Sequence, residues 1–515
     1  MSKRGIELPE DEPRPLKSGE RPQTANGGED EVGQFEDEFE DEYESEDEIL
    51  EAGVDGRPDD EREAEEAEDQ KNAMDVDQQT FIPGRSKLQA GETLSPDAST
   101  YEMLHTLSTT WPCLSFDILA DDLGDWRSNY PATAYAVTGT QASAGREKEN
   151  EIMALKLSGL SRMQRNPELE SDSDDDDSGD DDEDAEPILE SRSIPINTTI
   201  NRIRAHQMPR INSSIPPTTL TASMAESGNV LVHDITPHLT SFDTPGTTIT
   251  PQQNRPVSTL RMHRSVEGYA VDWSPLVPQG KLLTGDNEGN IFVTSQSEAG
   301  GWTTDTRPFT NHEGSVEELQ WSPSERNVFA SCSSDGTIKI WDVRSKSHKP
   351  ALSVAVSASG ADVNVMSWSR QTAHLLASGA DDGVWGVWDL RQWKPPPANK
   401  GTASAAVVEN PAKTSVASFS FHKEPITSIE WHPREDSVVA VAAADSTLTL
   451  WDLAVELDDE EVNGQNTGTQ EDVPPQLLFV HYMDNVKECH WHPQMPGAVM
   501  ATGGEGFGVF KTISV

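Results

Sequence analysis

The stretch HEGSVEELQWSPSERNVFASCSSDGTIKIWD, residues 312–342, decides the fold. Two β-prone runs, 328–331 and 337–341, flank the tight-turn signal Ser-Ser-Asp-Gly at 333–336. A Trp-Ser-Pro begins at Trp321, and a Trp-Asp pair follows at Trp341, 20 residues later. This arrangement predicts antiparallel strands joined by short turns.

The same unit recurs along the chain. A Trp followed by Ser or His stands at Trp273, Trp321, Trp368, Trp431 and Trp491, and Trp-Asp pairs begin at Trp341, Trp388 and Trp451. Because the spacing inside a unit is fixed and the spacing between units varies, the pattern indicates one repeated structural unit with insertions. It resembles the WD-repeat β-propeller family, which has four strands per blade. Six units start near Ile200, His263, His312, Ser359, His422 and His481, and strands between 114 and 160 supply another. We therefore expect an all-β, seven-bladed WD-repeat propeller.

The family resemblance also implies a hydrogen-bond network inside each blade, made by a His, a Ser or Thr, the turn Asp and a Trp. The residues of this sequence that match it are His312, Ser331, Asp335 and Trp341. The unit that starts at His422 departs from the pattern, because Val441 stands where the hydroxyl is expected. These residues are expected to stabilise blades, since buried polar groups must satisfy one another.

The charge of the chain is concentrated outside the repeats. The sequence has 90 acidic and 39 basic residues, a net charge of −51. Residues 1–80 hold 30 acidic residues against 8 basic ones, residues 168–190 hold 14 and none, and residues 456–472 hold 7 and none. This excess argues against a domain that grips nucleic-acid phosphates, and it predicts a basic partner.

The domain organisation follows from these patterns. Residues 1–92 are acidic and poor in apolar side chains, which predicts a disordered tail. Ser95 and Pro96 suit a helix start, so a helix is expected within 93–110. The propeller then spans 111–515, with acidic insertions at 165–190 and 454–476. With three cysteines, no apolar run long enough to span a membrane and no signal peptide, we expect a soluble, intracellular protein in a reducing compartment.

Two further resemblances narrow the family. The helix that enters Trp111-Pro-Cys-Leu and the acidic insertion that ends in Glu471-Asp-Val-Pro-Pro are similar to the histone-binding WD-repeat proteins, the retinoblastoma-associated and chromatin-assembly chaperones. The acidic run 170–184 and the acidic tail resemble the glutamate-rich WD-repeat proteins, which are nucleolar ribosome-assembly factors. Ser99 and Thr100 stand where the histone chaperones carry a bulky apolar pair, so the histone contact is expected to be weakened or replaced.

The resemblance implies a function and its partners. We expect a monomeric nuclear and nucleolar chaperone for a basic large-subunit ribosomal protein, acting around pre-ribosomal particles and also binding histones. Direct binding of nucleic acid or of a membrane is not expected. Histone chaperoning in chromatin assembly is an alternative main function, and a passive assembly scaffold is another.

In the histone-binding family the helix and the Pro-Pro loop form a groove for a basic amphipathic helix. The partner-binding residues predicted by this resemblance are Tyr101, Leu104, Glu471, Asp472 and Phe479, with Asp174, Asp175, Asp176, Asp177, Asp180, Asp181 and Asp182 of the acidic run. Tyr101 and Leu104 fit a purely structural docking role equally well, and the acidic run also fits a solvated loop. Three serines, each with an acid three residues later, are candidates for phosphorylation: Ser171, Ser173 and Ser178.

No pattern in the sequence supports catalysis. His490 and His492 stand near Cys489, but strand alternation places only the two histidines on one face and no further ligand is evident. We therefore expect no enzyme activity, no cofactor and no metal. A substrate receptor of a cullin-type ubiquitin ligase is an alternative from another class, because Arg344 and Arg391 follow two Trp-Asp pairs in the manner of such receptors.

Overall fold

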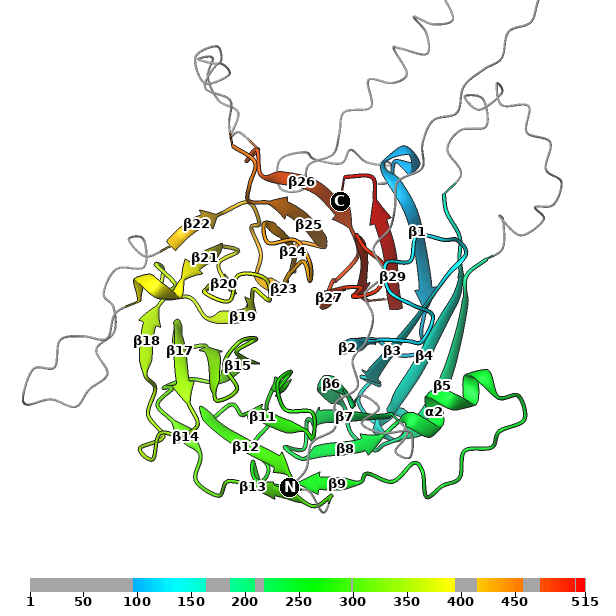
Figure 1. The fold of residues 1–515 in the computed structure, drawn as a ribbon, viewed down its shortest axis with the longest axis horizontal. Coiled ribbons are helices and arrows are strands. Elements are labelled where there is room, and N and C mark those ends of the chain that lie inside the picture. The colour runs from blue at the N-terminus through cyan, green and yellow to red at the C-terminus, as the bar shows by residue number, and fades with distance from the viewer. Residues whose placement is uncertain are drawn as a thin grey trace, which may run out of the picture. The chain divides into compact units, whose positions relative to one another are not determined.

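The computed structural model describes residues 96–163, 186–208, 217–297, 300–393, 415–456, 473–504 and 506–514. Within these ranges the chain forms seven antiparallel sheets, arranged around a central axis in chain order (Figure 1). The predicted seven-bladed, all-β propeller is confirmed. The strands from the region 114–160, which were expected to supply an additional blade, form most of blade 1.

The innermost strand of each blade comes first in the chain. Blade 1 holds β2 (Cys113–Leu119), β3 (Ala132–Thr140), β4 (Glu151–Leu160) and β5 (Ile188–Pro195). Blade 2 holds β6 (Ile200–Met208), β7 (Thr218–Ala225), β8 (Val230–Asp234) and β9 (Ser258–Leu260). Blade 3 holds β10 (Ala270–Trp273), β11 (Lys281–Gly285) and β12 (Asn290–Gln296), which pairs with both β13 (Trp302–Thr304) and β14 (Phe309–Thr310).

Blades 4 to 6 repeat the same order. Blade 4 holds β15 (Val316–Trp321), β16 (Val328–Ser333), β17 (Thr337–Asp342) and β18 (Leu352–Ala355). Blade 5 holds β19 (Val363–Trp368), β20 (Leu375–Ala380), β21 (Trp385–Asp389) and β22 (Ser415–Phe419). Blade 6 holds β23 (Ile426–Trp431), β24 (Val438–Ala443), β25 (Thr447–Asp452) and β26 (Leu477–Tyr482).

Blade 7 joins the two ends of the propeller. It holds β27 (Glu488–Trp491), β28 (Ala498–Thr502), β29 (Gly506–Thr512) and β1 (Tyr101–Ser108). The N-terminal strand β1 pairs antiparallel with β29, with Leu104 opposite Phe510. Because the first strand of the domain completes the last blade, the ring closes without leaving the edge of β29 unpaired.

The prediction of a helix within 93–110 is wrong. A single 3-10 turn, Ala98–Thr100, is followed directly by β1. The Asp97 side chain accepts a hydrogen bond from the backbone N–H of Ser99, so the local capping signal is real but supports one turn only. The free edge of β29 offers a whole row of backbone partners, and this tertiary pairing overrides a weak local preference for helix.

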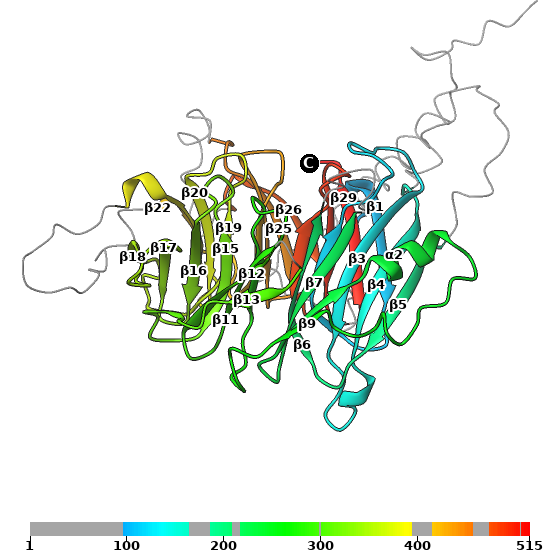
Figure 2. The same cartoon turned by 60° about the horizontal axis from the view of Figure 1, so that its bottom comes forward.

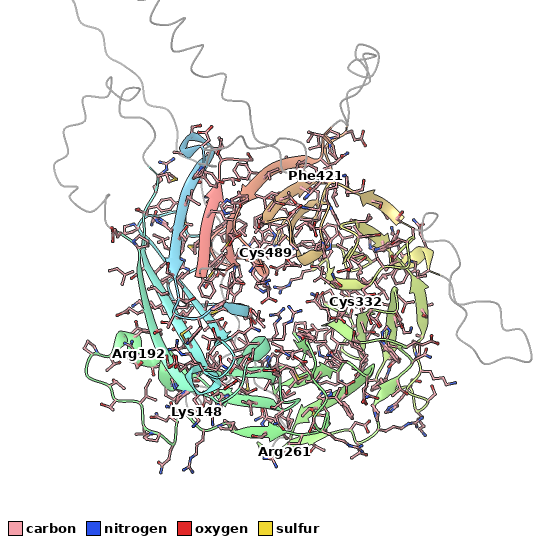
Figure 3. All side chains as sticks on the ribbon, turned by 180° about the vertical axis from the view of Figure 1, so that it is seen from behind. Lys148, Arg192, Arg261, Cys332, Phe421 and Cys489 are labelled. Atoms are coloured by element: carbon pink, nitrogen blue, oxygen red, sulfur yellow. The ribbon has the colours of Figure 1, made fainter. Side chains whose placement is uncertain are left out.

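Apolar clusters hold neighbouring blades together. Within the described residues, one cluster of buried side chains lies in each of the seven junctions between adjacent blades. The three cysteines are free and buried, and Figure 3 shows Cys332 and Cys489 inside the ring. Since a single blade cannot cover both of its faces, the stability of each repeat depends on its neighbours.

Carboxylates on the innermost strands add a polar connection between blades. In five junctions a carboxylate accepts a hydrogen bond from a backbone N–H of the next blade: Asp117 from Ala205, Asp272 from Trp321, Glu318 from Met366, Glu430 from Trp491 and Glu488 from Phe116. Glu488 also lies 2.7 Å from Nη2 of Arg204 and 2.5 Å from Nη1 of Arg202, both from blade 2. Charged side chains therefore crosslink blades 7, 1 and 2 around the central axis.

One short α-helix, which the sequence reasoning missed, lies against blade 1. Helix α2 (Thr236–Asp243) contacts the outer strands β4 and β5 (Figure 2). Arg192 of β5, labelled in Figure 3, donates from Nε to Ser241 Oγ at 3.0 Å, and its guanidinium lies 4.5 Å from the ring centroid of Phe242. No helix in the described ranges is long and apolar enough to cross a membrane.

Candidate functional site at the junction of blades 6 and 7

Two of the predicted partner-binding residues, from distant parts of the chain, meet at the junction of blades 6 and 7. The Tyr101 ring of β1 and the Phe479 ring of β26 lie edge to face, with centroids 5.1 Å apart. Leu104, also on β1, packs partly buried on the same apolar cluster. We call this place the β1–β26 seam; its half-buried apolar residues are Leu104, Met163, Leu478, Phe479 and Met483.

Tyr101 forms the base of the seam rather than its surface. Its side chain is 4% exposed, and its hydroxyl lies 2.8 Å from Nδ1 of His481. Burial raises the pKa of Tyr101 far above its ordinary value, so the phenol stays protonated. Burial also lowers the pKa of His481 to about 4, so the imidazole is neutral at pH 7. Leu104 and Phe479 are therefore the predicted residues that offer apolar surface here.

The described ends of both acidic insertions lie beside the seam. Met163, the last described residue before the first insertion, donates its backbone N–H to the carbonyl of Glu102 in β1 at 2.9 Å and packs on the seam cluster. Val473, the first described residue after the second insertion, is 39% exposed and lies four residues before the start of β26. The two insertions thus flank one apolar strip.

The predicted charged residues themselves lie outside the described ranges. These are Glu471 and Asp472, the aspartates Asp174, Asp175, Asp176, Asp177, Asp180, Asp181 and Asp182, and the candidate phosphorylation sites Ser171, Ser173 and Ser178. The expected acidic tail, 1–92, lies outside them as well. The expected insertion 165–190 ends inside a strand, because β5 begins at Ile188.

The blade network forms as the family resemblance implies. In blade 4, His312 Nδ1 lies 2.9 Å from Asp335 Oδ2, and His312 Nε2 lies 2.6 Å from Ser331 Oγ. The indole N–H of Trp341 donates to the same hydroxyl at 2.8 Å. These four side chains are tied to one another inside a single blade, which is a structural arrangement.

Blade 6 supplies its missing hydroxyl from another strand. Thr449 of β25 lies directly opposite Val441 of β24 in the register. Its Oγ1 accepts from the indole N–H of Trp451 at 2.7 Å and lies 3.0 Å from Nε2 of His422. Sequence reasoning missed Thr449 because it searched one position of the repeat, whereas cross-strand neighbours share the same interior space.

His490 and His492 take different structural roles. His490 Nδ1 lies 3.0 Å from Glu430 Oε2, while His492 Nδ1 accepts from the backbone N–H groups of Gln494 and Met495. Among the described residues, no group of three or more His, Cys, Asp or Glu side chains is arranged to hold a metal ion. The polar contacts of these two histidines hold together the junction of blades 6 and 7 and the loop that follows β27.

The central axis holds a charged cluster that sequence reasoning also missed. A cavity of about 250 Å³ is lined by charged side chains that include Arg202, Arg204, Asp272, Glu318, Glu430, Glu488 and His490. The signal was present as Arg-x-Arg at 202–204 and Glu-x-His at 488–490, since alternate residues of a strand share one face. Most of these charges are already paired across blades, so the cluster serves to join them.

Comparison with known proteins decides the family. Residues 91–161 match the family model that describes histone-binding protein RBBP4 and its counterpart in the CAF1 complex, and residues 303–342 and 413–452 match the WD domain, G-beta repeat. Over 515 residues, covering 100% of both chains, the sequence is 45% identical to ribosome assembly protein rrb1 of Schizosaccharomyces pombe. The chain belongs to this family of WD-repeat proteins.

Other members of the WD-repeat assembly family are similar over most of the propeller. Protein HEAT STRESS TOLERANT DWD 1 of Arabidopsis thaliana is 42% identical over 458 residues, which cover 84% of this chain and 91% of the relative. Glutamate-rich WD repeat-containing protein 1 of Dictyostelium discoideum is 39% identical over 439 residues, covering 83% and 84%. Both resemblances that the sequence suggested, to the glutamate-rich WD-repeat proteins and to the histone-binding WD type, are confirmed.

Proposed function

We propose that this protein is a non-enzymatic chaperone of ribosome assembly that holds a basic large-subunit ribosomal protein at the β1–β26 seam. The observation that carries the proposal is that the described ends of both acidic insertions lie beside this seam. The full-length similarity to a ribosome assembly protein supports the same process. The protein would act in the nucleus and nucleolus as a monomer, with pre-ribosomal particles as its surroundings.

The division of work follows from the chemistry of the two parts. The insertions carry 14 acidic residues in 168–190 and 7 in 456–472, with no basic residue in either. Acidic segments attract a lysine- and arginine-rich client over about one Debye length, roughly 8 to 10 Å at physiological salt, and so raise the rate of encounter. Leu104 and Phe479 would then fix the register by contacting an apolar face of the client. Phosphorylation of Ser171, Ser173 or Ser178 would deepen the negative charge.

Histones are proposed as further clients. The match to the histone-binding family model covers residues 91–161, which include β1 and the seam residue Leu104. Ser99 and Thr100, which replace an apolar pair of that family, lie just before β1, and Thr100 belongs to the 3-10 turn beside the seam. A histone helix would lose apolar contact there, so we expect histones to bind more weakly than the ribosomal client.

The test is client binding by purified full-length protein. A basic large-subunit ribosomal protein and core histones are each titrated at low and at physiological salt, against wild type and the double variant Glu471→Gln, Asp472→Asn. We expect the ribosomal client to bind more tightly than histones, and the variant to lose affinity mainly at low salt. Equal binding by the wild type of an acidic protein of similar size would contradict the proposal.

A substrate receptor for a cullin-type ubiquitin ligase is a second candidate, favoured by one observation. Arg344 and Arg391 each lie 2.7 Å from the aspartate of the preceding Trp-Asp pair, and their side chains are 68% and 67% exposed. The two guanidinium groups are thus held in the same way on adjacent blades. Recovery of a ligase adaptor by the wild type and its loss in Arg344→Ala, Arg391→Ala would support this role; recovery of ribosomal proteins by both would count against it.

A further inference from the structure

Trp126 is a large aromatic residue that the fold presents to solvent. It lies in the loop between β2 and β3, and its side chain is 62% exposed. Its φ of 62° falls in the left-handed region, which glycine and asparagine adopt readily and a bulky residue rarely does. Because strained backbone of this kind gathers at functional sites, Trp126 is a candidate for a binding residue.

The loop that carries Trp126 is fixed by blade 7. Gln494 accepts a hydrogen bond from the backbone N–H of Asp121 at 2.8 Å and donates to the Asp121 carbonyl at 2.9 Å. The backbone N–H of Arg127 donates to the Gln494 carbonyl at 3.0 Å, and Arg127 pairs with the Asp121 carboxylate at 2.9 Å. The indole is therefore positioned in the free protein, and little ordering entropy opposes its use in binding.

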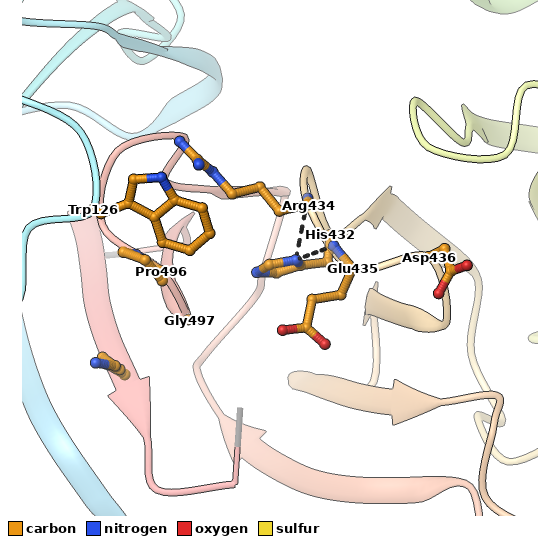
Figure 4. A pocket seen from close by; sticks show the side chains of 8 residues that line it. Trp126, His432, Arg434, Glu435, Asp436, Pro496 and Gly497 are labelled. Carbon is orange, nitrogen blue, oxygen red and sulfur yellow. Dashed lines mark hydrogen bonds between the residues drawn. The ribbon is translucent and has the colours of Figure 1, made fainter. Parts of the chain in front are cut away.

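Trp126 borders a pocket of about 400 Å³, seen in Figure 4. The walls come from three blades: Trp126 from blade 1, the segment 432–436 from blade 6, and Pro496 and Gly497 from blade 7. Burial lowers the pKa of His432 to about 4, so this imidazole adds no charge at pH 7. His432 Nδ1 accepts from the backbone N–H groups of Arg434 and Glu435, which fixes the turn that lines the pocket.

The basic side chains of the pocket are already engaged. The Arg434 guanidinium lies 3.9 Å from the centroid of the Trp126 ring and donates to the Pro493 carbonyl at 3.2 Å. Lys511 pairs with Glu102 at 2.8 Å. By contrast, Glu435 and Asp436 are exposed, and within the described ranges neither takes part in an ion pair. The charge available to a ligand here is negative.

We propose that the Trp126 pocket is a second docking site for the client, separate from the β1–β26 seam, and that it takes an extended lysine- or arginine-rich segment. One cationic side chain of that segment lies against the indole of Trp126 and pairs with Glu435 or Asp436. Tryptophan is the strongest aromatic partner for a cation, and a fixed tryptophan beside a carboxylate selects a positive charge. The inference rests on the proposed function in one respect only, namely that the client is basic.

The test measures binding of a fluorescent peptide of alternating arginine and alanine to the full-length protein, by anisotropy at low and at high salt. Trp126→Gly and Trp126→Asn suit the left-handed backbone, so both variants are expected to fold and to melt close to the wild type. We expect both to bind the peptide at least about fivefold more weakly, and the difference to persist at high salt because the indole contact is short-ranged. Val257→Ala, which alters an exposed apolar side chain of blade 2, is the matched control.

The outcomes separate this inference from the proposed function. If wild type fails to bind the peptide, both fail. If wild type and the Trp126 variants bind it equally, the pocket is not a docking site while the proposed function stands. Equal losses for a leucine–alanine peptide would overturn the cationic ligand, and a loss of self-association in the Trp126 variants would assign the pocket to a second copy of the chain. Weaker binding by Glu435→Gln, Asp436→Asn at low salt would support the pairing.

Discussion

The hydroxyl of Tyr101 lies 2.8 Å from Nδ1 of His481, a residue 380 positions later in the chain. Tyr101 belongs to the strand that closes blade 7, and His481 belongs to the outer strand of blade 6. Both side chains are buried, and His481 also stacks on Phe510 of β29 with ring centroids 4.1 Å apart. This one polar contact therefore couples the closure of the ring to the floor of the candidate client site.

Tyr101→Phe removes only the hydroxyl from this contact. The phenyl ring keeps its packing, but Nδ1 of His481 loses its partner in a buried place, so we expect a loss of about 1–3 kcal/mol in the free energy of unfolding. Chemical denaturation measures it. Tyr482→Phe is the control, because that side chain is 51% exposed and should change stability by much less. Equal effects of the two substitutions would refute the assignment.

Acid should destabilise the protein through His481. Its pKa is about 4 in the folded state against an ordinary value of 6.5. A depressed histidine pKa means that the unfolded chain binds the proton more readily, so the contribution is present above pH 6.5 and is lost as the pH falls toward 4. The loss is on the order of 3 kcal/mol. His490 has a pKa raised to about 10, so its contribution is already complete below pH 6.5 and does not alter this window.

The measurement is the free energy of unfolding of wild type and His481→Gln between pH 7 and pH 4. We expect the wild type to be more stable at pH 7 and the difference to shrink as the pH falls, because only the wild type must release a proton from this site on folding. A difference that stays constant over this range would show that His481 does not carry the acid sensitivity.

The sequence predicted the propeller because its defining signals are local and repeated. The turn around Asp335 and the fixed distance from Trp321 to Trp341 need no knowledge of distant contacts. The strand at Tyr101 could not be predicted in the same way, because its partner β29 lies at the far end of the chain. A short apolar segment after a capping signal suits a helix or a strand, and the unpaired edge of the last blade decides between them.

The candidate site was predictable only in part, for a similar reason. The family resemblance placed Tyr101 and Phe479 together, and their rings lie 5.1 Å apart. It did not reveal that Tyr101 is buried, since a helix and a strand present different faces. Trp126 gave no signal at all, because its exposure and its left-handed backbone follow from the bonds that Gln494 makes to a distant loop.

Glu488 is expected to be the most sensitive charge on the central axis. It is 1% exposed and compensates Arg202 and Arg204, whose guanidinium groups lie 2.5 and 2.7 Å away. Glu488→Gln leaves two buried cations without their carboxylate, so we expect a loss of about 3–5 kcal/mol. Urea unfolding measures it. Glu149→Gln breaks an exposed pair with Arg146 and should cost less than about 1 kcal/mol; a comparable cost would contradict the role assigned to Glu488.

The last prediction concerns the hydroxyl that blade 6 takes from Thr449. Thr449→Val keeps the shape of the side chain but leaves the indole N–H of Trp451 and Nε2 of His422 without this partner, in a fully buried place. We expect a loss of about 3 kcal/mol, similar to that of Ser331→Ala in blade 4, which removes the equivalent hydroxyl. Thermal and urea unfolding compare the two variants.

A swap variant tests the mechanism rather than the size of the effect. Val441 and Thr449 face each other across β24 and β25, so Val441→Thr with Thr449→Val moves the hydroxyl to the strand that corresponds to the one carrying Ser331 in blade 4. If the hydroxyl matters only as a partner for Trp451 and His422, the double variant should recover much of the stability that Thr449→Val loses. If the double variant is no more stable than the single one, the hydroxyl must act from β25, and the two blades do not use equivalent networks.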